Sequence, residues 1–120
     1  PTPFGRRVLD ALAPVLRAVP NRVDVEGHTN TVPVRPRFYP TEWELSTARA
    51  VTVVRYLIDS GGLDAARLSA TGFADQHPLL PASDPRSTRV NRRVEVVVVS
   101  TLPPAQRSLL VRLAPPAGPP

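Results

Sequence analysis

The sequence contains no cysteine and no lysine, and it has no long apolar run. Without cysteine, the chain cannot form a disulfide bridge, a thiolate nucleophile or a thiolate metal site. Its apolar runs fall short of the about 20 residues that span a bilayer, and no signal peptide is visible at Pro1. Because the chain starts without Met, we expect an excised domain whose anchor and export signal lie outside it.

Every one of the 15 basic residues is therefore arginine, and the net charge is +5. The guanidinium fork favours bidentate recognition of carboxylate or phosphate. The bias of a GC-rich genome is the alternative explanation of this composition. A basic chain also raises nucleic-acid binding as an alternative function. We do not expect a nucleic-acid partner, because the basic residues are scattered and do not alternate with aromatic ones.

Hydrophobic periodicity predicts a single domain with alternating helices and strands. We expect a helix from residue 5 to 18, kinked or split at Pro14, and a second helix that begins at the N-cap Ser46 and ends at Gly61. A long loop from residue 28 to 44 precedes the second helix. The predicted strands cover 22–26, 68–72 and 94–99, the last buried on both faces, with a helical turn at 87–91 and a helix at 106–113.

This order of elements predicts an α/β two-layer sandwich with the helices on one face of the sheet. We assign residues 1–100 to the domain and residues 101–120 to a C-terminal helix or proline-rich tail. The sequence offers no catalytic group, because neither His28 nor His77 has a carboxylate or a second histidine at ligand spacing, and no phosphate loop is present. We expect no enzyme activity, no metal and no cofactor.

Arg49 is unusual for its position in the predicted second helix. At about the third residue of a helix, the macrodipole disfavours a cation by about 0.3–1 kcal/mol. Either a ligand carboxylate or an internal ion pair, with Glu42, Glu44 or Glu95, would compensate for this cost. The sequence alone leaves both explanations open.

Three short strings stand where the predicted elements begin or end, which is where an open α/β sheet places binding groups. The strings are Gly27-His28-Thr29-Asn30, Leu45-Ser46-Thr47-Ala48-Arg49-Ala50 and Asn91-Arg92-Arg93-Val94-Glu95. Their order resembles the OmpA-like peptidoglycan-binding domain, in its MotB-like branch, and the resemblance runs from about Phe4 to Val99. It implies a mixed sheet of βαβαβ type, whose first strand is shortened or missing here because only residues 1–4 precede the first helix.

The resemblance implies a binding site for diaminopimelate in the peptidoglycan stem peptide. In such domains, the position of Arg49 binds the carboxylate, and the position of Asn30 is normally an Asp that takes the ammonium group. We hypothesise that Glu42 replaces this missing carboxylate; the alternative is that Glu42 is solvated and binding is weakened. The candidate ligand-binding residues are Thr29, Asn30, Glu42, Leu45, Ser46, Arg49, Asn91, Arg92 and Arg93.

The same resemblance implies a noncatalytic anchor that holds a flagellar motor stator to the cell wall. The expected partners are peptidoglycan, a second copy of the chain in a homodimer, and a MotA-like channel subunit reached through a membrane segment absent from this chain. The expected location is the periplasm or another compartment facing the cell wall. A general OmpA-like anchor of an outer-membrane protein or lipoprotein, and a purely structural dimerisation module, are alternatives.

Overall fold

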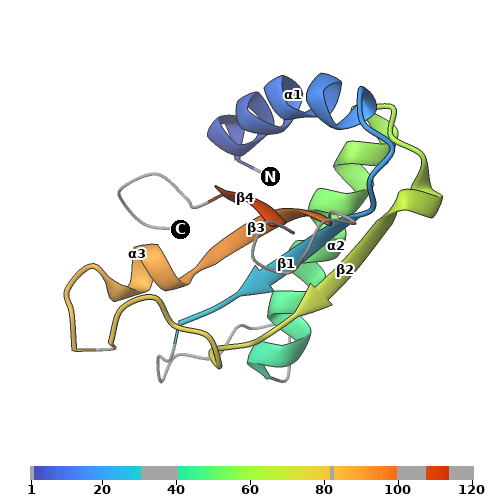
Figure 1. Ribbon diagram of the computed structural model, residues 1–120. Coiled ribbons are helices and arrows are strands. Elements are labelled where there is room, and N and C mark those ends of the chain that lie inside the picture. The colour runs from blue at the N-terminus through green and yellow to red at the C-terminus, as the bar shows by residue number, and fades with distance from the viewer. Residues whose placement is uncertain (1, 31–40, 82, 100–107, 114–120) are drawn as a thin grey trace.

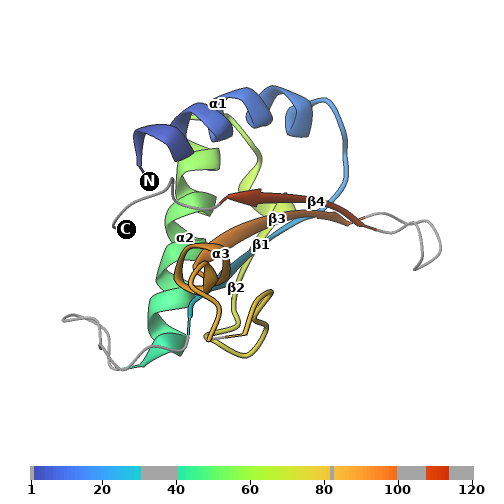
Figure 2. The same cartoon turned by 90° about the vertical axis from the view of Figure 1, so that its left-hand side faces the viewer.

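The computed structural model describes residues 2–30, 41–81, 83–99 and 108–113, the last as backbone only. Two long helices lie on one face of a four-stranded sheet with the strand order β2-β1-β3-β4 (Figures 1 and 2). The elements are α1 (Pro3–Arg17), β1 (Val23–His28), α2 (Glu42–Asp59), η1 (Ala65–Arg67), β2 (Leu68–Gly72), α3 (Ser87–Asn91), β3 (Arg93–Val99) and β4 (Ser108–Leu113).

The sheet is mixed, because β1 runs parallel to β2 and antiparallel to β3. β4 extends the sheet by pairing antiparallel with β3. The parallel pair requires a crossover, which α2 supplies on the helical face of the sheet. The predicted class, an α/β sandwich with a mixed sheet and helices on one face, is confirmed.

The core forms between the two helices and alternate residues of the central strands. Val23 and Val25 of β1 are fully buried, and Val96 of β3 lies opposite Val25. Because side chains alternate along a strand, Asp24, Glu26 and His28 point to the sheet face away from α1 and α2. The helices complete the core with Leu9, Ala13, Leu16, Ala50, Val53 and Leu57.

The first helix begins at Pro3, where the Thr2 hydroxyl accepts a hydrogen bond from the Gly5 amide at 3.0 Å. The helix continues without a break through Pro14 to Arg17, so it is not split at the proline. No strand precedes α1 in the described part of the chain, as we expected for a shortened first strand.

The helix predicted over residues 106–113 is wrong, because Ser108–Leu113 forms β4. Its register pairs Val94 with Leu113 and Val99 with Ser108, so the sheet crosses the boundary we had placed at residue 100. The spacing of the leucines suits a helix equally well, but the edge of β3 offers unpaired backbone groups that a strand can satisfy. The strand β3 is also less enclosed than predicted, since Val99 is exposed.

The second helix begins four residues before the predicted N-cap. Thr41 is the N-cap, and its hydroxyl accepts from the Trp43 amide at 3.2 Å. The Glu44 carboxylate accepts in return from the Thr41 amide at 2.9 Å, which completes a capping box. Ser46 therefore lies inside α2, and the predicted loop of residues 28–44 ends before Thr41; residues 31–40 lie outside the described residues.

Candidate functional site

Two paired glycines seat α2 directly on the sheet. Gly27 of β1 lies opposite Gly72 of β2, and both face the turn of α2 that holds Ser46 and Thr47. A Cβ atom at position 27 would lie 2.8 Å from the carbonyl carbon of Ser46, and one at position 72 would lie 2.7 Å from the Thr47 amide nitrogen. Only glycine allows this approach, so the pair fixes the position of the predicted Leu-Ser motif.

Ser46 connects α2 to the segment that follows β2. Its fully buried hydroxyl accepts a hydrogen bond from the Ala74 amide at 3.0 Å and donates to the Trp43 carbonyl at 3.1 Å. The Ala74 carbonyl accepts from the Thr29 amide at 2.8 Å. Ala74 has a φ of 53°, in the left-handed region that costs a residue with a Cβ about 1 kcal/mol. Sequence analysis missed this residue, because alanine carries no sign of a left-handed turn.

Thr29 is buried, and its hydroxyl oxygen has no hydrogen-bond partner among the described residues. A buried hydroxyl without a partner costs roughly 1–3 kcal/mol. Such a group next to the Ser46 contact is available to a ligand or to an ordered water. The role of Thr29 as a hydrogen-bond partner for a ligand stays a prediction.

Asn30 is buried in a network of side-chain amides. Its Oδ1 accepts from the Asn91 Nδ2 at 2.9 Å, and its Nδ2 donates to the Thr88 hydroxyl at 3.2 Å. Asn91, which is also buried, accepts from the amides of Leu79 and Leu80 at 2.8 and 3.0 Å. Both ends of the Asn30 amide are thus engaged within the protein. This network joins the end of β1 to α3. Asn30 comes from the first of the three sequence strings, and Asn91 comes from the third.

Arg92, which directly follows Asn91 of this network, is affected by the charges of Arg49 and Glu42. Burial lowers the pKa of the Arg92 guanidinium, the charge of Arg49 lowers it further, and the charge of Glu42 acts in the opposite direction. The charges of Arg49 and Glu42 therefore both act on Arg92, and these three residues make up the candidate group. Arg49 lies more than one turn inside α2, so the helix-dipole argument made from the sequence is wrong.

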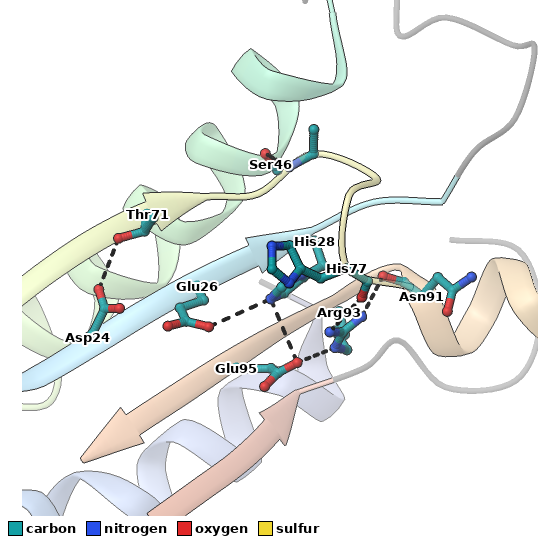
Figure 3. A network of polar contacts seen from close by, with 10 residues as sticks. Asp24, Glu26, His28, Ser46, Thr71, His77, Asn91, Arg93 and Glu95 are labelled. Carbon is teal, nitrogen blue, oxygen red and sulfur yellow. Dashed lines mark hydrogen bonds and ion pairs between the residues drawn. The ribbon is translucent and has the colours of Figure 1, made fainter. Parts of the chain in front are cut away.

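The structure separates Arg93 from this group. Arg93 lies in β3 with its guanidinium against the Glu95 carboxylate, and it also donates to the His77 carbonyl at 3.1 Å. Both side chains point to the sheet face away from the helices, as the alternation of β3 predicted (Figure 3). Leu45 lies half-buried in the first turn of α2.

A cluster of ionisable side chains on that same sheet face was missed. The His28 Nε2 lies 3.8 Å from Glu26 Oε1 and 3.6 Å from Glu95 Oε2. Burial, a hydrogen bond with Asp24, and the charges of Asp24 and Glu95 together raise the pKa of Glu26 to about 7. We had stated that neither histidine has a carboxylate at ligand spacing, which is wrong for His28. The alternation of β1 already placed Glu26 and His28 on one face of the sheet. The sequence does not show that Glu95 lies opposite them, because this depends on the register between β1 and β3.

A model of the OmpA family matches residues 2–92. The chain belongs to the OmpA family. As a member of this family, the domain is a noncatalytic one, as expected. It is 37% identical to Motility protein B of Escherichia coli (strain K12) over 101 residues, which cover 82% of this chain and 32% of that protein.

Two solved structures share the fold of this OmpA-family chain. The cell wall anchor of the T6SS from Pseudomonas aeruginosa is 35% identical, with a TM-score of 0.72 over 81% of this chain and 67% of that one. The periplasmic domain of Helicobacter pylori MotB has a TM-score of 0.70 at 24% identity, over 76% of this chain and 59% of that one.

The OmpA-family chain spans between 31% and 38% of the length of three curated relatives that it matches. Among its described helices, none is long and apolar enough to cross a membrane.

Proposed function

We propose that the domain binds peptidoglycan noncovalently, through the diaminopimelate of the stem peptide. The observation that carries this proposal is that the charges of Arg49 and Glu42 both act on the half-buried Arg92, which directly follows the buried Asn91. Two guanidinium groups held together repel each other, and a ligand carboxylate between them relieves that repulsion through charge-assisted hydrogen bonds. The ligand ammonium group then binds the nearby carboxylate.

In this proposal, Glu42 supplies the negative charge that the Asn30 amide lacks. Asn30 is engaged at both ends by Asn91 and Thr88, so its amide has a structural use inside the protein. Glu42 is half-buried in the first turn of α2 and close enough to Arg92 to affect its pKa. Charge-assisted hydrogen bonds are roughly twice as strong as neutral ones, which makes Glu42 the stronger partner for an ammonium group.

Calorimetric titration of a diaminopimelate muropeptide tests the site. We expect Arg49→Ala and Glu42→Gln each to weaken binding at least about tenfold, as loss of a charged hydrogen bond worth about 1.5–3 kcal/mol implies. Arg55→Ala is the matched control, because Arg55 is exposed on the same helix. A stem peptide with lysine in place of diaminopimelate lacks the side-chain carboxylate, and it should lose the dependence on Arg49.

The proposal fails if the wild-type domain shows no binding at low salt, or if Arg49→Ala behaves like Arg55→Ala. Unchanged affinity in Glu42→Gln would return the ammonium site to position 30. In that case, Asn30→Asp should strengthen binding, because an Asp can accept from both Asn91 and Thr88 and still add a charge.

We further propose that the domain lies in the periplasm and anchors a flagellar stator, as a homodimer with a MotA-like channel subunit. The similarity to Motility protein B supports this role. A general anchor of another cell-wall machine is the second candidate, favoured by the 35% identity to the T6SS anchor. Exchange of this domain into a MotB-type stator protein tests the two: restored swimming supports the stator role, and wall binding without swimming supports the general anchor.

A further inference from the structure

The sheet face away from the helices carries a second cluster of binding groups, apart from the proposed peptidoglycan site. Glu26 and His28 project from β1 and Glu95 projects from β3 (Figure 3). One ligand atom from each of these three residues lies within 4.8 Å of the other two. We propose that Glu26, His28 and Glu95 bind a divalent transition-metal ion, with Zn²⁺ as the best fit.

The backbone holds the three groups in place. Glu26 lies directly opposite Glu95 in the antiparallel register, and His28 lies two residues further along the same face of β1. Ligand atoms on a tetrahedral Zn²⁺ at about 2.0–2.2 Å lie roughly 3.3–3.6 Å apart. The distances of 3.6 and 3.8 Å from the His28 Nε2 to the two carboxylates are close to this range. The Glu26 and Glu95 oxygens lie within 4.8 Å of each other, so a side-chain movement of up to about 1 Å would bring all three groups to tetrahedral spacing.

Neighbouring groups fix two of the ligands. The Phe73 ring stacks on the His28 ring, with centroids 5.2 Å apart and an angle of 10° between the planes. The Arg93 guanidinium binds Glu95 and is held by the His77 carbonyl. Outer contacts of this kind orient the ligands of metal sites. His28 and Glu95 are nearly inaccessible, whereas the Glu26 side chain is 23% exposed and provides the route of entry.

The charge of the cluster also favours a divalent cation. Two of the three ligands are carboxyl groups, and Asp24 lies beside Glu26. Among the described side chains, the Arg93 guanidinium pairs with Glu95. A divalent ion would displace the proton that burial and the neighbouring carboxylates favour on Glu26, and it would neutralise the charge left there. Imidazole and carboxylate ligands suit Zn²⁺, and they also suit Co²⁺ as a spectroscopic substitute.

A cation of the protein itself is the alternative to a metal ion, and the register pairs Arg112 of β4 with Glu95. The two possibilities differ in outcome. If an arginine neutralises the carboxylates, the domain takes up no metal. If the inference is correct, Zn²⁺ binds with a stoichiometry of one ion per chain.

Competition for Zn²⁺ against a chromophoric chelator measures this affinity, and Co²⁺ gives a visible absorption band when the ligands surround it. We expect Glu26→Gln and His28→Gln each to lower Zn²⁺ affinity at least about tenfold, since loss of even an outer-shell partner costs about 10–100-fold. Asp59→Asn is the matched control, because Asp59 is an exposed carboxylate that lies outside the cluster.

Circular dichroism confirms that each variant folds, and Glu26→Gln decides the test if the buried His28 cannot be replaced. Failure of the wild-type domain to bind Zn²⁺ overturns the inference. Wild-type affinity in Glu26→Gln, or loss of binding in Asp59→Asn, also overturns it. These results are independent of muropeptide binding, so the two proposals can fail separately.

Discussion

Replacement of Ser46 by alanine tests how α2 is attached to the rest of the site. The Ser46 hydroxyl is fully buried and is the acceptor for the Ala74 amide at 3.0 Å. Alanine removes this acceptor without creating space for water. The Ala74 N–H then stays buried without a partner, which costs about 1–3 kcal/mol. Alanine gains about 0.5 kcal/mol over serine in a helix, so the net loss is about 1–2 kcal/mol.

Urea unfolding measures this loss of free energy. In thermal unfolding, a domain of this size would lose about 4–8 °C in Tm for each kcal/mol. Thr52→Ala is the control: the Thr52 hydroxyl donates to the Ala48 carbonyl at 2.9 Å, but on the exposed side of the same helix. This control should gain a few tenths of a kcal/mol from helix propensity.

Hydrogen exchange provides a local readout that total stability does not. The Ala74 amide should exchange slowly in the wild-type domain and rapidly in Ser46→Ala, and the Thr29 amide should follow because the Ala74 carbonyl holds it. Equal stability of Ser46→Ala and wild type, with the Ala74 amide still protected, would refute the role given to the hydroxyl.

Three further changes test other parts of the structure. Gly27→Ala should lower the free energy of unfolding by more than about 3 kcal/mol, because α2 must move off the sheet. Gly5→Ala, in the first turn of α1, is the control and should not lower it. Calorimetry measures both, and a Gly27→Ala variant as stable as the wild type would contradict the prediction. Truncation after residue 107 removes β4 and should cause self-association through the β3 edge, seen by light scattering; a monomer at all concentrations would contradict this. The raised pKa of Glu26 stabilises the fold below about pH 4.5, and this contribution is lost as the pH rises through about 7. In chelator, Glu26→Gln should therefore be the more stable form at pH 8, by about 1–2 kcal/mol after allowance for partial exposure, and equal stability there would be the contrary result.

The elements with clear periodicity were predictable from the sequence. The alternation of Val23 and Val25 defines β1, and the heptad-like spacing of Leu9 and Leu16 defines α1. The start of α2 was not, because the serine in the Leu-Ser motif is as good an N-cap as Thr41. The start of α2 is fixed by the capping-box hydrogen bonds between Thr41 and Glu44. The spacing of these two residues was visible in the sequence but was not used in the prediction.

The candidate site was predictable as a set of residues but not as an arrangement. Arg92 and Arg93 are neighbours in sequence, and the strand alternation predicted correctly that Arg93 shares a face with Glu95. Their partners depend on the register, which the sequence does not specify: Glu95 meets Glu26 and His28 only because β1 and β3 pair as they do. The strand β4 was missed for the same reason, since its pairing with β3 is a tertiary contact.

The alternation of β1 limits how this protein can change by insertion and deletion. The odd-numbered residues Val23, Val25 and Gly27 face the helices, and the even-numbered residues Asp24, Glu26 and His28 face the other way. Loss or gain of one residue within this strand would exchange the two faces, placing carboxylates in the core and the glycine away from α2. Variation in length among descendants of this chain should therefore be confined to the connections on either side of β1.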